Sequence, residues 1–124
     1  SALIVFNYNG ERISSPYIYA LKTDKVDEDT ILYNWPFPNV HGNGRVCMGQ
    51  NILPIIKNKN DLVALTRWLL QLPYVNDLYE AAIRNVPKMS PRELFNELVD
   101  NEFPEGWLVR ASYAKTIKEF MSKL

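Results

Sequence analysis

The only cysteine of the chain, Cys47, lies in a short segment rich in glycine and polar residues that could present a nucleophile. It follows Asn39 by eight residues, and a Gly-Asn-Gly run occupies positions 42–44 between them. The thiolate is the nucleophilic form of cysteine, and a neighbouring cation such as Arg45 favours it if its side chain points the same way. His41, six residues before the cysteine, is close enough through a turn to act as a base. This segment is therefore the candidate site for cysteine chemistry.

Each of these residues also has a purely structural interpretation. A lone cysteine in a soluble protein is most often a small buried hydrophobic residue. Asn39 before a glycine-rich stretch is typical of a turn in which the side chain bonds nearby backbone, and His41 could only cap the loop. The Gly-Asn-Gly run is too short and wrongly spaced to cradle a phosphate. The residues alone therefore leave both interpretations open.

The composition predicts one globular domain without a metal or cofactor. With 124 residues, 47% of them hydrophobic, the chain can bury one sizeable core, so we expect a single domain over residues 1–124. Its 14 basic residues balance 14 acidic ones, which provides no net attraction to nucleic acid or to an anionic membrane. One cysteine and one histidine exclude an internal disulfide and leave too few ligands for a zinc site. The apolar stretches are too short to span a bilayer and no signal sequence is recognised, so we expect a cytoplasmic protein.

The N-terminal third has the pattern of an antiparallel sheet. Leu3–Phe6 reads as a strand that enters an Asn9-Gly10 turn, and residues 13–15 begin the return. Residues 17–21 and 30–33 are further strand-like runs, separated by an acidic turn. Prolines 36 and 38 end the last strand, because proline cannot donate to a ladder. The cysteine therefore lies on an irregular loop after a β-meander.

From residue 60 the hydrophobic spacing becomes helical. Leu62, Leu65, Leu69 and Leu72 fall on one face of a helix that opens at Asn58 or Asn60 and stops before Pro73. Ser90, a proline after it and Glu93 form the signature of a capping box. Further helices are expected over residues 76–83 and from Ser112 to the end, with Phe103–Trp107 as an aromatic connector. The predicted fold class is α+β: an antiparallel β-meander, a cysteine-bearing loop, and three to four C-terminal helices.

The segment around the cysteine resembles that of a known enzyme family. Pro38 and Asn39, followed by Gly44 and Cys47, are similar in identity and spacing to the His-Pro-Asn to catalytic cysteine segment of ubiquitin-conjugating enzymes, with Phe37 in place of histidine. A closer resemblance is to the bacterial branch of that superfamily, the PRTRC system protein B family, and it covers most of the chain, weakly after residue 75. The positions that carry this resemblance are Leu3–Phe6, Tyr19–Leu21, Leu32–Tyr33, Pro36–Phe37, Asn39–Val40 and Gly44–Gly49.

This resemblance implies a carrier of a ubiquitin-like modifier protein. Cys47 would receive the C-terminus of the modifier as a thioester from a ThiF-type adenylating enzyme and pass it to an amine, while Asn39 would stabilise the oxyanion of the intermediate. A lysine acceptor must become neutral to attack, and we expect His41 or Asp77 to assist that step. The alternatives are a catalytically inactive scaffold of the same fold that binds a ubiquitin-like protein or an activating enzyme, and a regulatory subunit without modifier chemistry.

The N-terminal part is shorter than the resemblance implies. Only 36 residues precede Phe37, whereas the family has an N-terminal helix and a longer meander there. We therefore expect a truncated ubiquitin-conjugating fold that lacks the N-terminal helix and first strands. It would correspond to the C-terminal part of a longer protein, or to a reduced domain that pairs with itself or with a partner. An exposed sheet edge near the N-terminus would favour such association.

Overall fold

The computed structural model describes residues 1–7, 14, 16–48, 57–72 and 76–124 and has the predicted α+β fold. Within these residues the sheet is antiparallel, in the order β1 (Ala2–Val5), β2 (Tyr17–Ala20) and β3 (Tyr33–Asn34). The helices are α1 (Lys59–Leu70), α2 (Ala81–Arg84), α3 (Pro91–Leu98) and α4 (Ile117–Ser122), with the short 3-10 helices η1 (Asn76–Leu78) and η2 (Glu105–Trp107). The expected Asn9-Gly10 turn lies outside the described residues.

The two faces of the sheet bury two separate cores. Leu3 pairs with Tyr19 on one face and Ile4 pairs with Ile18 on the other, because successive side chains of a strand point to opposite sides. The first core continues with Leu21, Leu32, Ala111, Ala114 and Phe120, and the second with Val40, Val46, Met48 and Leu72. The central strand β2 is therefore covered on both sides.

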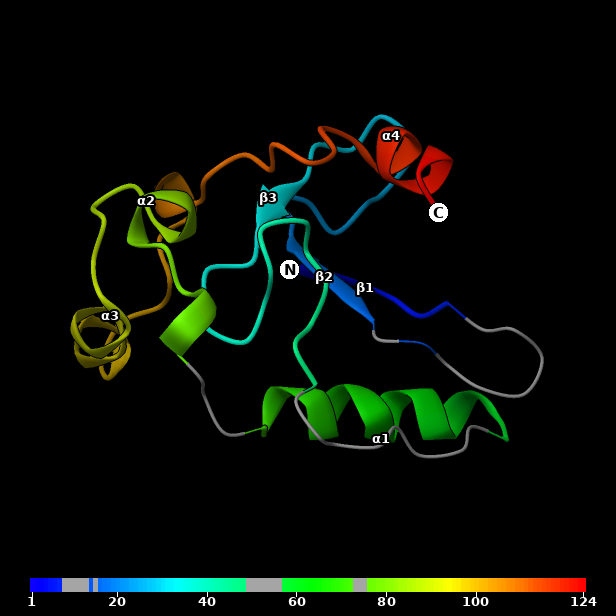
Figure 1. Ribbon diagram of the computed structural model, residues 1–124, viewed down its shortest axis with the longest axis horizontal. Coiled ribbons are helices and arrows are strands. Elements are labelled where there is room, and N and C mark those ends of the chain that lie inside the picture. The colour runs from blue at the N-terminus through cyan, green and yellow to red at the C-terminus, as the bar shows by residue number, and fades with distance from the viewer. Residues whose placement is uncertain (8–13, 15, 49–56, 73–75) are drawn as a thin grey trace.

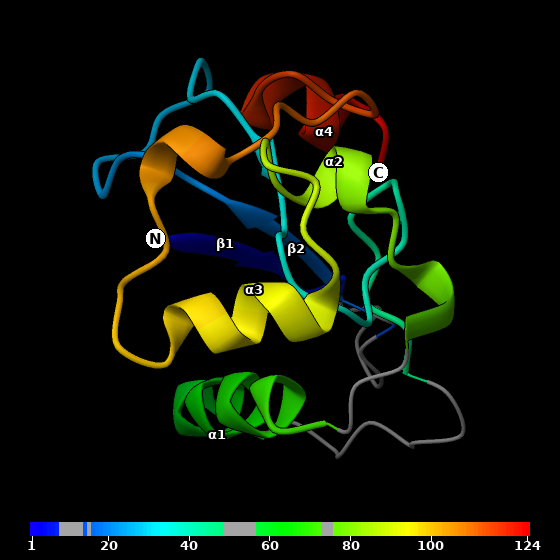
Figure 2. The ribbon, with the colours of Figure 1, turned by 90° about the vertical axis from the view of Figure 1, so that its left-hand side faces the viewer.

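Helices α1 and α4 supply these covers. Trp68 and Leu69 of α1 pack against the second core, and Ile117 and Phe120 of α4 belong to the first. Figure 1 shows the resulting layers, with α1 below the sheet and α4 above it. Helices α2 and α3 lie at the left of that view and therefore face the reader in Figure 2. No helix in the described part of the chain has the length and apolar character needed to cross a membrane.

Three helices begin at capping residues that the local sequence provides. Asn58 accepts hydrogen bonds from the backbone of residues 60 and 61, and the Asp61 carboxylate accepts from the Asn58 N–H in return. Ser90 caps α3, with a proline at its first turn, and Thr116 caps α4. Each cap satisfies N–H groups that the first turn of a helix leaves without a partner.

The prediction of one continuous helix over residues 76–83 is wrong. The segment is divided into η1 and α2, with Glu80 in an extended conformation between them. The division lets the Tyr79 hydroxyl donate to the Met89 carbonyl at 2.9 Å. It also lets Arg84 reach back to the Leu78 carbonyl at 3.5 Å. These partly buried polar contacts override the local helix propensity.

The last helix starts later than expected, and β3 is shorter than the predicted strand. Residues 109–116 first run beside residues 30–34, where the Leu32 N–H donates to the Lys115 carbonyl and the Ala111 N–H donates back to the Leu32 carbonyl. A bridge also joins Ile31 to Thr116. Residues 111, 115 and 116 are held by these contacts and the chain bends between them, so α4 begins only after Thr116.

Candidate functional site

Residues 39–47 form a small hairpin that places the cysteine opposite the asparagine. Val40 bridges Val46, the His41 N–H donates to the Arg45 carbonyl at 2.9 Å, and the Cys47 N–H donates to the Asn39 carbonyl at 2.6 Å. The spacing of eight residues is thus the spacing of two partners in an antiparallel pair. What the sequence presented as an irregular loop is an ordered backbone frame for the thiol.

The second arm of this hairpin extends the sheet along β2. The Ile18 N–H donates to the Gly44 carbonyl and the Val46 N–H donates to the Pro16 carbonyl, both at 2.8 Å, and Tyr17 bridges Arg45. This arm lies on the same side of β2 as β3, which pairs with residues 19 and 20. Cys47 is therefore the first residue beyond the sheet, held by a rigid strand on its N-terminal side.

A buried tyrosine, Tyr19, holds the turn of the hairpin in place. Tyr19 has no exposed surface, and its hydroxyl donates to the Asn43 carbonyl. Gly44 has a φ of 88° and lies so close to the tyrosine ring that any Cβ would overlap it. Burial raises the pKa of the Tyr19 phenol, with smaller contributions from the charges of Tyr113 and Tyr17. The neutral hydroxyl is thus the form that the fold favours.

The hairpin has an apolar face and a polar face. Val40 and Val46 are buried in the second core, whereas His41 and Arg45 are exposed and Cys47, a free thiol, is partly exposed. Arg45 and Cys47 are two residues apart on one arm, so their side chains project to the same side. Among the described residues, no group of three or more His, Cys, Asp or Glu side chains is arranged to hold a metal ion.

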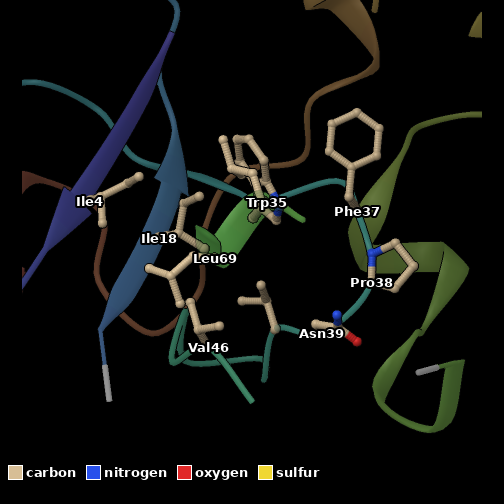
Figure 3. Close-up of a pocket in the computed structure, with 10 residues that line it drawn as sticks. Ile4, Ile18, Trp35, Phe37, Pro38, Asn39, Val46 and Leu69 are labelled. Carbon is tan, nitrogen blue, oxygen red and sulfur yellow. The ribbon is translucent and has the colours of Figure 1, made fainter. Parts of the chain in front are cut away.

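Asn39 is buried, and its backbone adopts a φ of 72°. Asparagine is one of the few residues that tolerate this left-handed conformation. In Figure 3 its side-chain amide points away from Val46. Asn39 itself lines a small, mostly apolar pocket, together with Phe37, Pro38, Ile4, Ile18, Trp35, Leu69, Leu70 and the two hairpin valines. Conformation and packing thus both constrain the backbone that carries the amide.

Asp77 is exposed and lies on a separate element, η1. A residue that the sequence did not single out connects that element to the hairpin: Arg84, which is 1% exposed. One of its terminal nitrogens, Nη2, donates to the Val40 carbonyl and also to the Leu78 carbonyl. Asn39 directly precedes Val40 and Asp77 directly precedes Leu78. Both residues therefore lie next to a carbonyl that the same nitrogen of Arg84 binds. Burial lowers the pKa of the Arg84 guanidinium, against smaller opposing contributions from Tyr79 and Glu80.

Phe37, which stands where the conjugating enzymes have histidine, belongs to an aromatic cluster. Its ring centroid lies 5.3 Å from that of Trp35, 5.9 Å from Phe95 and 6.0 Å from Phe103. The cluster joins the start of the site segment to α3 and to the connector before η2. This position therefore packs the segment against the helices rather than offering a polar group.

The α+β fold, with a cysteine hairpin between sheet and helices, agrees with the truncated conjugating-enzyme-like fold that the resemblance implies. The chain matches the family model of prokaryotic E2 family D over residues 2–111 and belongs to that family. The match includes the complete hairpin, η1 and α2. Searches of curated proteins and of solved structures found no match. Family membership places the chain among the bacterial E2-like proteins of ubiquitin-like conjugation, whose partners are ubiquitin-like proteins or activating enzymes.

Proposed function

We propose that this protein is a transferase that carries a ubiquitin-like modifier as a thioester on Cys47 and passes it to an amine. The observation that carries the proposal is the pairing of Cys47 with Asn39 across the hairpin, with the Cys47 N–H on the Asn39 carbonyl at 2.6 Å. The cysteine is partly exposed, and the exposed Arg45 lies on the same side of its strand, so the sulfur is accessible beside a positive charge. A thiol placed in this way is suited to accept an acyl group.

The reaction consists of two acyl transfers. In the first, the Cys47 thiolate attacks the thioester carbonyl that joins the modifier to a ThiF-type activating enzyme, and the thiolate of that enzyme leaves. In the second, a neutral amine attacks the new thioester, an amide forms, the amine gives up a proton, and the Cys47 thiolate leaves. Both steps pass through a tetrahedral intermediate with an oxyanion, and one well-placed amide donor contributes roughly 2.7 to 4 kcal/mol to its stabilisation. Asn39 is the proposed donor.

The second transfer requires the acceptor to lose a proton. An unperturbed lysine has a pKa of about 10.4, so making it neutral at pH 7 costs roughly 4.6 kcal/mol. Asp77 and His41 are the proposed aids, because both are exposed. Asp77 lies on the element that Arg84 connects to the hairpin, and His41 lies within the hairpin itself.

The second candidate is a catalytically inactive scaffold that binds a ubiquitin-like protein or an activating enzyme. The position of Phe37 favours it, because an aromatic cluster occupies the place where conjugating enzymes carry a polar histidine. A scaffold would keep the hairpin for its shape, and the cysteine would form no bond with a partner.

The test is to incubate the protein with ATP and with the adenylating enzyme and ubiquitin-like protein encoded by neighbouring genes. The transferase proposal predicts an adduct that a thiol reductant removes, that is absent with Cys47→Ala, and that resists reduction with Cys47→Ser because the ester replaces the thioester. An adduct that persists in Cys47→Ala would exclude Cys47 as the carrier. A stable complex without any adduct would support the scaffold.

The finer assignment is to the PRTRC system protein B branch, as the C-terminal part of a longer protein, acting in the cytoplasm. Its support is the set of identities over Gly44–Gly49 and the position of residues 44–48 between sheet and helices. Genes for an adenylating enzyme and a ubiquitin-like protein beside this one would support that assignment. Self-association through the β1 edge is a further proposal, because β1 pairs only with β2 among the described strands.

A further inference from the structure

The buried guanidinium of Arg84 bonds three backbone carbonyls, two of which belong to residues more than forty positions away in the sequence. Nη1 donates to the Trp35 carbonyl at 2.8 Å, and Nη2 donates to the carbonyls of Val40 and Leu78. Trp35 and Val40 lie 49 and 44 residues before the arginine. One side chain therefore connects α2 to the segment that follows β3, to the hairpin and to η1.

The two carbonyls at residues 35 and 40 bracket the segment 36–39, whose last residue is Asn39. Fixing both ends of four residues limits how that segment can rotate, and Asn39 lies within it at a φ of 72°. The Cys47 N–H then bonds the Asn39 carbonyl. The contact between Arg84 and Val40 is thus one residue away from the pairing that sets Asn39 against the thiol.

The chemistry of arginine suits this task better than that of lysine. A guanidinium is planar and its donors diverge in a fixed fork, so it can hold carbonyls from different segments in one geometry. Within the described residues, its Nε is buried without a hydrogen-bond partner, which is unfavourable for a buried donor. The fold buries a charged group here, bonds it to neutral carbonyls and leaves one of its donors unsatisfied. The benefit that offsets this cost is that the guanidinium holds those carbonyls in position.

We infer that Arg84 is a positioning residue for the transfer reaction: it fixes the segment 36–39 so that Asn39 stays opposite Cys47. The catalytic part of this inference, a slower transfer reaction, rests on the proposed function. The structural part, that Arg84 holds the segment 36–39, does not. Replacing the fork with one ammonium group in Arg84→Lys should loosen the pairing of Asn39 with Cys47. The matched control is Arg92→Lys, which makes the same change on an exposed arginine of α3.

The first measurement is residue-resolved amide hydrogen exchange by NMR in the variants with unchanged cooperative unfolding. We expect the Cys47 N–H to exchange at least about tenfold faster in Arg84→Lys, and faster still in Arg84→Met. The Leu32 N–H, which bonds the Lys115 carbonyl at 3.0 Å, should change less than about twofold. Arg92→Lys should change neither. Equal protection of Cys47 in wild type and Arg84→Lys would overturn the inference, and so would loss of folding in both Arg84 variants.

The second measurement is a double-mutant cycle that uses N-acetyl-glycylglycine as its thioester with 2-mercaptoethanesulfonate. The Cys47 thiolate displaces 2-mercaptoethanesulfonate from this probe, and intact-protein mass spectrometry follows the acylated product. If Arg84 acts through Asn39, Arg84→Lys should slow acylation about tenfold in the wild-type background and less than about twofold in the Asn39→Gly background. Asn39→Gly removes the amide but tolerates the positive φ.

The two measurements separate failure of the inference from failure of the proposed function. Equal slowing by Arg84→Lys in both backgrounds would overturn the inference, because Arg84 would then act independently of Asn39. If wild type accepts no acyl group from the probe or from a charged activating enzyme, the transferase proposal fails. In that case the exchange of the Cys47 N–H still decides whether Arg84 holds the segment.

Discussion

Replacing Gly44 with alanine should destabilise the protein far more than the same change two residues earlier. At Gly44, an added Cβ would lie 2.6 Å from the Tyr19 hydroxyl oxygen and 2.8 Å from Cε1 of the same ring, with Cζ nearest of all. At Gly42, the added Cβ would meet nothing within 4 Å. The two glycines share one turn, so Gly42→Ala is a matched control.

The magnitude follows from two separate effects. A residue with a side chain at the φ of 88° observed for Gly44 is disfavoured by about 1–2 kcal/mol. Forcing extra volume against a packed ring costs roughly 1–3 kcal/mol more. Tyr19 cannot easily yield, because it has no exposed surface and its ring packs edge-on against Phe120 at 5.2 Å between centroids. Together these effects predict a loss of roughly 2–5 kcal/mol for Gly44→Ala.

Urea denaturation followed by circular dichroism measures the free energy of unfolding of both variants. Since small domains have a total stability of about 5–15 kcal/mol, Gly44→Ala should lower the midpoint markedly or prevent folding at moderate temperature. Gly42→Ala should stay within about 0.5 kcal/mol of wild type. If the two variants lose the same free energy of unfolding, Gly44 does not pack closely against the Tyr19 ring. The explanation of how the turn is held would then be wrong.

Three further predictions test the site residue, the buried phenol and a helix cap. Asn39→Gly should slow acyl transfer to Cys47 by roughly 10²–10³-fold while the protein stays folded; a normal single-turnover rate would remove Asn39 from the mechanism. Burial raises the pKa of the Tyr19 phenol in the folded state. The buried neutral phenol therefore contributes fully to the free energy of unfolding below the unfolded-state pKa of about 10, and this contribution is lost as the pH rises beyond that value. Thermal unfolding between about pH 9 and pH 11 should therefore show a steeper loss for wild type than for Tyr19→Phe, and parallel curves would contradict the assignment. Asn58→Ala removes the acceptor of the α1 cap and should cost about 1 kcal/mol in chemical denaturation. The exposed neighbour Asn60 offers the control substitution, and an equal effect of Asn60→Ala would show that the cap is not the cause.

The parts of the fold that local patterns control were predicted from sequence. The leucine spacing from Leu62 to Leu72 follows the helical period and α1 covers Lys59–Leu70. Ser90 with its proline marked the start of α3. The runs of β-prone residues predicted β1 and β2 to within one residue at each end. In these elements the residues that set the conformation are near neighbours in the chain.

The errors arose where distant partners decide the conformation. The helix expected over residues 76–83 breaks because Tyr79 and Arg84 bond carbonyls outside their own helix. The start of α4 is delayed because residues 111, 115 and 116 pair with the backbone of residues 31 and 32. A hydrophobic periodicity observed over ten residues contains no information about contacts between residues that are more than forty positions apart in the sequence.

The site divides in the same way. Asn39 and Cys47 were found by spacing, and the hairpin explains why that spacing matters. Arg84 was missed because an arginine at the end of a short apolar run is normally solvated, and nothing near it in the sequence indicates burial. Its partners Trp35 and Val40 become visible only in three dimensions.

The four residues of α2 also set an order of folding. An isolated helix of this length is not stable in water, and α2 is held by distant groups: the Asn34 side chain donates to the Ile83 carbonyl 49 residues away. Such long-range contacts form late, after the chain between them has been closed. Because synthesis runs from the N-terminus, the Cys47 hairpin also leaves the ribosome before Arg84, the residue that holds it. Weakening this junction should then accelerate unfolding in stopped-flow kinetics much more than it slows refolding.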